Sequence, residues 1–250
     1  QYFKDKALLT EACQKENLPV KFIRYIYWVH KSVVGKKLYA ESISRGKGSA
    51  IIAHLGEGRR DDPYNQREFE VVKLLGLDLP HINFVHGVGV TEAGLEEMGS
   101  KQMGLIWSPF SNLLLYGQTL DIVSAVKKNI LIALGSDWLP TGSRGVLEEV
   151  KLARNYILKM KLEEDIIKYT GSINLDEALY KMMTENPAKM INHWRGVGRD
   201  IWSNGEAKGG VGTLVEGAMG TFIVTSKVDQ NPYTNLVKYI TAEKINLVVV

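Results

Sequence analysis

Three positions in this chain place a metal-binding or proton-transferring side chain at the end of a short apolar run: His54, His86 and Asp137. A fourth residue, Glu57, follows soon after His54. Imidazole binds divalent metals, and a carboxylate either binds a metal or moves protons. If the fold brings these four side chains to one cleft, the chemistry they support is metal-assisted hydrolysis.

Each of these residues also has a purely structural interpretation. His54 fits a core histidine bonded to the backbone, with Glu57 on a solvated loop, and taken alone this pair favours that interpretation. His86 fits a strand-end histidine bonded to a loop carbonyl, but a second histidine at an equivalent strand end is harder to explain by packing. Asp137 fits an N-cap of the loop that follows. Burying a carboxylate without a partner is costly, however, which favours a functional role for Asp137.

Further polar and aromatic residues accompany these positions. Ser111 and Asn112 follow the apolar run that ends at Trp107, and they offer hydrogen bonds to a substrate or to a neighbouring loop. For Asn112 the loop role is favoured. Trp138 directly follows Asp137 and is a candidate for substrate contact. The remaining histidines, His30, His81 and His193, have no partner that the sequence identifies.

Apolar runs alternate with helical patterns from about residue 4 to residue 160, and this alternation indicates βα units with a parallel sheet. Strands are expected at 20–29, 50–54, 82–86, 104–107 and 130–134. Helices are expected at 8–16, 66–75, 120–128, 146–161 and 176–183, with a further helix that Thr91 caps. The predicted fold class is therefore α/β.

The reactive positions His54, His86 and Asp137 all fall at the carboxyl ends of expected strands, where an eight-stranded βα barrel assembles its active site. About five βα units are recognisable, so the expected fold is a TIM-like (β/α) barrel that is incomplete at its N-terminal side by about three strands. The barrel domain is expected over residues 1–195. Residues 196–250 contain Gly-rich, shorter strand-like runs and are expected to form part of a small C-terminal β-sandwich.

Composition and motif content exclude several classes of function. The 31 basic and 28 acidic residues are interspersed and give a net charge of +3, so nucleic acid is not an expected partner. The single cysteine, Cys13, cannot form an internal disulfide, and no apolar run is long enough to span a bilayer. We therefore expect a cytoplasmic protein without a membrane partner. Motifs for nucleotide phosphates, dinucleotides or a serine nucleophile are absent from the sequence.

Several short segments are weak signals alone but specific as an ordered set. They are His54–Gly58, His86–Gly87, Trp107–Tyr116, Gly135–Trp138 and Asn186–Lys189. Together they resemble the amidohydrolase superfamily, in particular the chlorohydrolase and aminohydrolase branch that includes guanine deaminase and adenosine-type deaminases.

The resemblance implies one divalent metal ion, zinc with iron as the alternative, and it places His54 and Asp137 among the ligands. It assigns Glu57 to proton transfer and His86 to contact with water or substrate, in agreement with the roles inferred from the residues. The implied reaction is hydrolysis of a carbon–nitrogen or related bond in a small heterocyclic substrate, of the deaminase type, by attack of metal-bound hydroxide. Asp137 would accept the proton of the attacking water.

The chain departs from the family pattern at two points. It contains no His-x-His pair, which is the usual ligand pair of the first barrel strand, and Gly220 stands where the closing motif usually has aspartate. Open sheet edges expose unpaired backbone groups, so we expect an upstream segment, a complementing chain or a like chain in a homo-oligomer to complete the barrel, or else the fold to rearrange. The alternative function is a non-catalytic amidohydrolase-like fragment or partner subunit that lacks a complete metal site.

Overall fold

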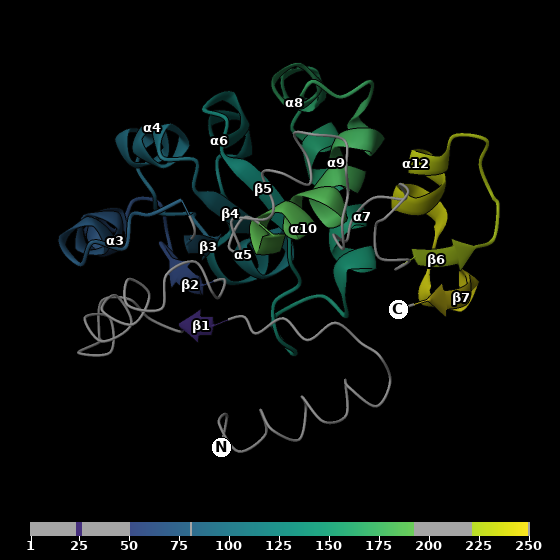
Figure 1. Cartoon of the computed structure of the whole chain (residues 1–250), viewed down its shortest axis with the longest axis horizontal. Coiled ribbons are helices and arrows are strands. Elements are labelled where there is room, and N and C mark those ends of the chain that lie inside the picture. Colours follow the sequence, from purple (N-terminus) through teal and green to yellow (C-terminus); the bar gives the residue numbers. More distant parts are fainter. Residues whose placement is uncertain (1–23, 27–50, 81, 193–221, 250) are drawn as a thin grey trace.

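A five-stranded parallel sheet forms the centre of the computed structural model, which describes residues 24–26, 51–80, 82–192 and 222–249 (Figure 1). The strands lie in chain order, and each pairs in parallel with the next. They are β1 (Arg24–Ile26), β2 (Ile51–Leu55), β3 (Ile82–His86), β4 (Gly104–Trp107) and β5 (Leu131–Leu134). Parallel neighbours need a crossover connection, so this order is that of successive βα units.

Helices α3, α4 and α6 lie next to one another along one side of the sheet, and α7, α9 and α10 lie beyond β5 (Figure 1). Side-chain caps fix where four helices begin, because Asp62, Thr91, Asp121 and Asn174 each accept a hydrogen bond from a backbone N–H of the first turn. The helices are α3 (Pro63–Leu74), α4 (Glu92–Ser100), α5 (Pro109–Tyr116), α6 (Ile122–Lys127), α7 (Val146–Lys159), α8 (Glu163–Thr170), α9 (Leu175–Met183) and α10 (Glu185–Asn192).

The structure confirms the α/β class and most of the expected elements. The strands predicted at 82–86 and 104–107 have the predicted bounds, and the Thr91 side chain caps α4 as expected. Helices α5, α8 and α10 were not predicted. The expected helix at 8–16 and the part of the Gly-rich, strand-like region before residue 222 lie outside the described residues.

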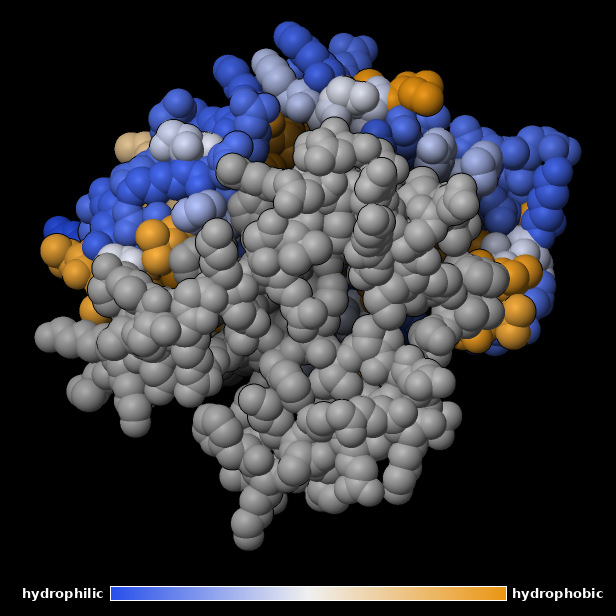
Figure 2. All heavy atoms as spheres, viewed as in Figure 1, coloured by the Kyte–Doolittle hydropathy of each residue, from blue (hydrophilic) through white to orange (hydrophobic). Residues whose placement is uncertain are grey.

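The core lies between the sheet and its helices. The largest fully buried side chains include Trp107 on β4, Phe84 on β3 and Phe69 on α3. Full burial of a large apolar side chain stabilises the folded state by about 1.5–3 kcal/mol relative to exposure. On the visible face, hydrophilic residues dominate the coloured surface, and apolar ones form small scattered groups (Figure 2).

The C-terminal segment forms a separate two-stranded antiparallel sheet of β6 (Phe222–Thr225) and β7 (Ile245–Val249), which confirms the expected small β element. Between these strands lie the helical turn α12 (Pro232–Thr234), the π-helix η2 (Asn235–Tyr239) and the 3₁₀ turn η3 (Ala242–Lys244). Both α12 and η2 pack against α9, and η2 also packs against α7. None of the helices in the described part of the chain has the length and apolar character needed to cross a membrane.

Candidate active site

The carboxyl ends of β2 and β3 and the loop after β5 bring four predicted residues together. His54 Nε2 lies 3.9 Å from Glu57 Oε2, and His86 Nε2 lies 3.7 Å from the same oxygen. Asp137 Oδ2 lies 4.0 Å from His86 Nε2. The two imidazole rings have centroids 5.1 Å apart. Residues far apart in the sequence therefore converge, as their shared position at strand ends predicts.

His86 adopts an uncommon backbone conformation at the end of β3. Its φ of 76° lies in the left-handed region, and Gly87 follows with a φ of 69°. A side chain in that region costs about 1–2 kcal/mol because its Cβ approaches the following carbonyl oxygen. The side chain of His86 is nevertheless fully buried, and it faces the two carboxylates of the site.

The loop that carries Glu57 packs backbone to backbone against the loop after β3. Gly56 has a φ of 57°, and a Cβ there would lie 3.1 Å from Gly89 N and 3.2 Å from Val90 N. Its N–H donates to Glu68 Oε2, a buried carboxylate on α3. Only glycine adopts this left-handed backbone and allows so close an approach without strain. The close packing and the hydrogen bond to Glu68 hold the Glu57 loop in place.

Glu57 is half-buried, and its environment favours the protonated carboxylic acid. Burial raises the pKa of Glu57 above its ordinary value; the nearby His54 and a hydrogen bond from Tyr116 lower it, and Asp137 raises it further. Tyr116 OH donates to Glu57 Oε1 over 3.2 Å. A raised pKa brings a carboxyl group closer to the range in which general acid–base catalysis is efficient.

His86 is held neutral by its surroundings. Burial lowers the pKa of His86 to about 4, and the neighbouring His54 lowers it too, although Asp137 acts in the opposite direction. One ring nitrogen, Nδ1, lies 2.8 Å from Asn112 Nδ2. The other, Nε2, makes no hydrogen bond to any residue that the structure describes. This nitrogen can therefore interact with a group bound between His54, Glu57 and Asp137.

Asp137 and Trp138 lie in the loop after β5. Asp137 Oδ1 accepts from Trp138 N over 2.8 Å, while Oδ2 faces His86. The backbone of Gly142 lies so close that a Cβ there would be 2.2 Å from the Asp137 carbonyl oxygen. This glycine lets the loop fold back behind Asp137. The Trp138 indole is 71% exposed, so its ring is accessible from the solvent.

Ser111 and Asn112 lie in α5 rather than in a loop, and both are buried. Ser111 Oγ donates to Ser108 O over 3.3 Å. The Asn112 amide contacts His86 on one side and Thr119 on the other. Their polar groups are thus directed at neighbouring protein atoms, and Asn112 reaches the site through His86.

Sequence reasoning missed several residues that support the site. Tyr116 on α5 contacts Glu57, Thr119 contacts Asn112, and Glu149 on α7 accepts from Phe110 N over 2.8 Å and from Ser143 Oγ. Burial raises the pKa of Glu149 above its ordinary value. None of these residues ends a predicted strand, so their position along the chain carried no signal. A buried carboxylate is recognised only when its hydrogen-bond donors are seen.

The donor set at this site fits a divalent metal. Among the described residues, His54, Glu57 and His86 offer ligand atoms that all lie within 4.8 Å of one another, and Asp137 adds a carboxylate beside them. Imidazole nitrogen and carboxylate oxygen are the ligands that catalytic zinc sites use. The chain thus presents a metal-compatible cluster where the βα barrel places its chemistry.

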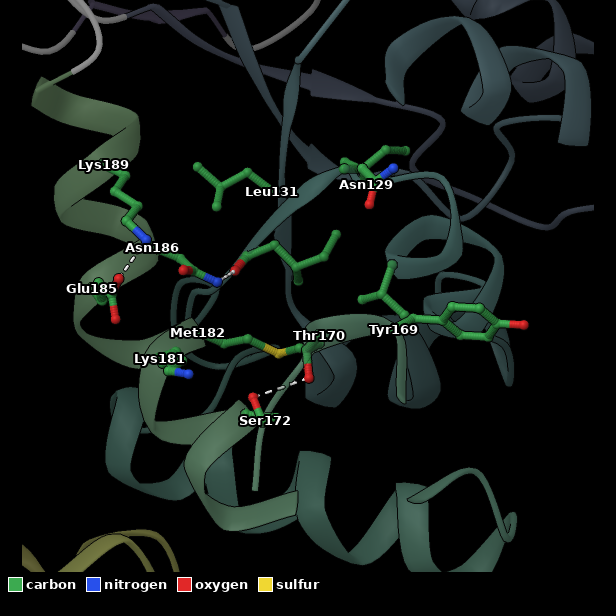
Figure 3. A pocket seen from close by; sticks show the side chains of 14 residues that line it. Asn129, Leu131, Tyr169, Thr170, Ser172, Lys181, Met182, Glu185, Asn186 and Lys189 are labelled. Atoms are coloured by element: carbon green, nitrogen blue, oxygen red, sulfur yellow. Dashed lines mark hydrogen bonds and ion pairs between the residues drawn. The ribbon is translucent and has the colours of Figure 1, made fainter. Parts of the chain in front are cut away.

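A second hollow lies at the opposite end of β5. Its lining includes Ile130 and Leu131 at the start of the strand, together with side chains of α8, α9 and α10. Figure 3 shows three pairs of polar groups there: Asn186 donates to the Ile132 carbonyl oxygen, Thr170 donates to Ser172, and Lys189 pairs with Glu185. These mutual contacts indicate a structural role at this end of the sheet.

The sequence of the chain is similar to those of known deaminases. No family model matches the chain. The chain is 23% identical over 201 residues to a 5-methylthioadenosine/S-adenosylhomocysteine deaminase of Thermococcus sibiricus, a match that covers 77% of this chain and 42% of that protein. A similar deaminase of Pyrococcus abyssi is 24% identical over 160 residues, covering 62% of this chain and 36% of that protein. The resemblance to the amidohydrolase superfamily is confirmed.

Solved structures agree on the fold. The crystal structure of a Xanthomonas campestris adenosine deaminase with bound zinc matches with a TM-score of 0.69 at 14% identity, covering 100% of this chain and 54% of that one. Escherichia coli guanine deaminase matches with a TM-score of 0.63 at 17% identity, over 86% of this chain and 48% of that one. The described sheet therefore corresponds to part of a TIM-type barrel. The chain spans about half the length of these relatives, or less.

Proposed function

We propose that this chain belongs to a metal-dependent hydrolase that acts on carbon–nitrogen bonds of small heterocyclic substrates, of the deaminase type. The observation that carries the proposal is the convergence of His54, Glu57, His86 and Asp137 at the carboxyl ends of parallel strands. The similar proteins named above are deaminases, and their printed activities support the substrate class.

A divalent metal, zinc with iron as the alternative, is held by His54 and Asp137 in this proposal. Support comes from the cluster of ligand atoms and from the zinc in the similar adenosine deaminase. A bound divalent ion supplies Lewis acidity, which makes water nucleophilic near neutral pH. Zinc sites use three or four protein ligands, and His54 and Asp137 supply two of them in this proposal.

The side chains of this chain carry the proton transfers. The attacking water forms a bond to the ring carbon while Asp137 takes one of its protons and Glu57 gives its own proton to the ring nitrogen. Glu57 then accepts the remaining hydroxyl proton and passes it to the amine, whose bond to carbon breaks, and the proton on Asp137 restores the acid form of Glu57. The raised pKa of Glu57 suits that role, because the carboxyl group then binds more strongly the proton that it transfers to the ring nitrogen. His86 Nε2 faces the same space and stabilises the charge that develops on the adduct.

Trp138 is the substrate contact that we propose among the predicted residues. Its exposed indole next to Asp137 offers a flat face on which a heterocycle can stack. Ser111 and Asn112 make their hydrogen bonds within the protein, so we infer that they shape the site from behind rather than bind the substrate directly.

The remaining expectations extend this proposal. We propose that residues 1–195 belong to the barrel domain and residues 196–250 to a small β-domain, with β6 and β7 as part of it. A homo-oligomer or a complementing chain, a cytoplasmic location and the absence of nucleic-acid partners stay predictions from composition and sheet geometry.

Elemental analysis of the purified 250-residue chain tests the metal site. We expect about one zinc or iron per chain, lost in both His54→Ala and Asp137→Ala and kept in Asp165→Ala, an exposed aspartate on α8 that serves as the matched control. Ammonia release from a panel of aminated purines and pyrimidines then tests the activity. A metal content at background level, or a content that the first two substitutions leave unchanged, contradicts the proposed site.

A further inference from the structure

Four side chains behind the site form a continuous series of hydrogen bonds that ends on His86. Trp107 Nε1 donates to Thr119 Oγ1 over 2.7 Å, and Thr119 Oγ1 donates to Asn112 Oδ1 over 3.3 Å. Asn112 Nδ2 then lies 2.8 Å from His86 Nδ1. All four residues are buried, with Thr119 the most exposed at 2%. Water does not compete for these bonds, so their directions are fixed by the protein.

The direction of the series follows from its first member. An indole N–H can only donate, so Thr119 Oγ1 must accept from Trp107. The Thr119 hydroxyl proton is then directed at Asn112, which means that the oxygen of the Asn112 amide faces Thr119. If the amide were rotated, the Thr119 proton would lose the acceptor that the structure gives it, and a buried unsatisfied donor costs about 1–3 kcal/mol.

The amide orientation in turn determines the proton position on His86. With Asn112 Oδ1 on Thr119, the group that faces His86 Nδ1 is the N–H₂ donor, so Nδ1 must be the bare, accepting nitrogen. A neutral imidazole carries one proton, which then resides on Nε2. We propose that Trp107, Thr119 and Asn112 are positioning residues that fix His86 as the Nε2–H tautomer, with this N–H directed into the site.

This tautomer distinguishes His86 from a metal ligand. The Nε2 atom of His86 is close enough to His54 and Glu57 for all three to share an ion. Ligation through Nε2 would require a bare Nε2 and a protonated Nδ1, and that Nδ1–H would point at the N–H₂ group of Asn112. A histidine ligand normally donates its second N–H to a carboxylate or a carbonyl oxygen. The hydrogen-bond series therefore makes His86 a donor to the reacting group, a consequence that rests on the proposed function.

The tautomer is measurable without substrate. The sequence has only 5 histidines, so the long-range ¹H–¹⁵N correlations of their rings can be assigned by single substitutions. Nε2 is the ring nitrogen that correlates strongly with both carbon-bound protons, and its chemical shift shows whether it carries a proton. At pH 7.5 with chelator, we expect one set of His86 signals with a protonated Nε2. A bare Nε2 in the wild-type chain would overturn the proposal.

Substitutions along the series supply the matched comparison. Thr119→Ser keeps the hydroxyl and should leave the His86 signals unchanged. Thr119→Val removes it without changing the size of the side chain much, so the Asn112 amide can rotate and both tautomers should be populated. Asn112→Asp places an acceptor opposite Nδ1 and should move the proton there. His86 signals in Asn112→Asp that match the wild type would contradict the assignment.

Zinc titration of the same sample separates this proposal from the proposed function. We expect added zinc to shift the His54 signals, while Nε2 of His86 stays protonated. Loss of the Nε2 proton on zinc addition would make His86 a ligand and overturn the donor role. If no histidine signal responds to zinc while His86 keeps its Nε2–H, the proposed metal site fails in this chain and the tautomer assignment stands.

Discussion

Several features of the site act on the pKa of Glu57: burial and Asp137 raise it, and His54 and Tyr116 lower it. We expect Glu57→Gln to lower kcat for ammonia release by a factor of about 10²–10⁴, because glutamine keeps the shape and cannot transfer the proton. Metal content should stay unchanged. Glu70→Gln, on the exposed face of α3, is the control with ordinary activity. Loss of the metal in Glu57→Gln would instead identify Glu57 as a ligand.

The buried neutral His86 predicts a dependence of stability on pH. Its pKa is about 4 in the folded chain and about 6.5 in the unfolded chain, so the unfolded state binds more protons between these values. The free energy of unfolding should therefore be highest above pH 6.5 and fall by up to about 3 kcal/mol as the pH drops to 4.

Urea denaturation at several pH values, with chelator present, measures this dependence. His86→Asn, which does not titrate and tolerates the left-handed backbone, should show a shallower decrease over the same range. Glu57 and Glu149 have raised pKa values and act in the opposite direction in both proteins, so the comparison isolates the histidine. Equal slopes would show that His86 is not the group responsible.

At the residue level, the sequence predicted the reactive side chains better than their supports. His54, His86 and Asp137 were found because apolar runs mark strand ends, and parallel strands end at one edge. Thr119 lies between α5 and α6, where nothing local distinguishes it from a surface threonine. Its role depends on three partners from β3, β4 and α5, which only the packed structure brings together.

At the level of elements, Glu149 on α7 joins the first turn of α5 to the loop that contains Ser143. Glu149→Ala would leave Phe110 N–H without this acceptor and Ser143 Oγ with the Gly145 carbonyl oxygen alone, and we expect a loss of about 1–3 kcal/mol in the free energy of unfolding. Its neighbour Glu148, with a side chain 52% exposed, provides the control, and Glu148→Ala should change stability by less than about 0.5 kcal/mol. Similar losses in the two variants by urea denaturation would show that the buried carboxylate has no special role.

The elements themselves were predicted where a compact apolar run marks a strand, as for β3 and β4, or where a helical pattern is long, as for α7. Helix α5 was missed because its first residue, Pro109, follows a serine, and Ser-Pro is typical of turns. Proline is also favoured at the first position of a helix, where its missing N–H has no cost. No side chain caps α5 at Ser108; instead Glu149, distant in sequence, accepts from Phe110 N. The residues around Ser108 give no sign of this substitute for a cap, because Glu149 is far from them in the sequence.

At the scale of the whole molecule, Asp176 links the C-terminal segment to the barrel helices. It accepts from Arg154 Nε on α7 and from Thr234 Oγ1 on α12, each over 2.7 Å. We expect Asp176→Ala to cost about 1–3 kcal/mol and to speed amide hydrogen exchange over residues 235–240. In Asp165→Ala, exchange over these residues should match the wild type. Unchanged exchange in Asp176→Ala would show that other contacts, such as Lys151 Nζ to the Ile240 carbonyl, suffice.

The sequence indicated the small β element but not how α12 and η2, which lie between its strands, pack against α7 and α9. Strand propensity and glycine spacing predict β6 and β7, because these are local properties. The docking depends on a few specific contacts, among them the Tyr180 and Tyr233 rings at 5.2 Å and the Asp176 bonds. Single contacts of this kind produce no periodic pattern in the sequence of either segment. They could therefore not be predicted before the folded structure was known.

Position 86 has to meet two requirements that favour different residues: a left-handed backbone, which favours glycine, and an imidazole in the site. Glycine there would relax the turn and make the chain easier to fold, but it would remove the imidazole and leave the Asn112 amide without its partner. A β-branched residue would satisfy neither demand. At position 86 the residue that best fits the backbone is thus not the residue that the site uses. The strained backbone at the end of β3 is retained because it places an imidazole nitrogen where the parallel strands converge.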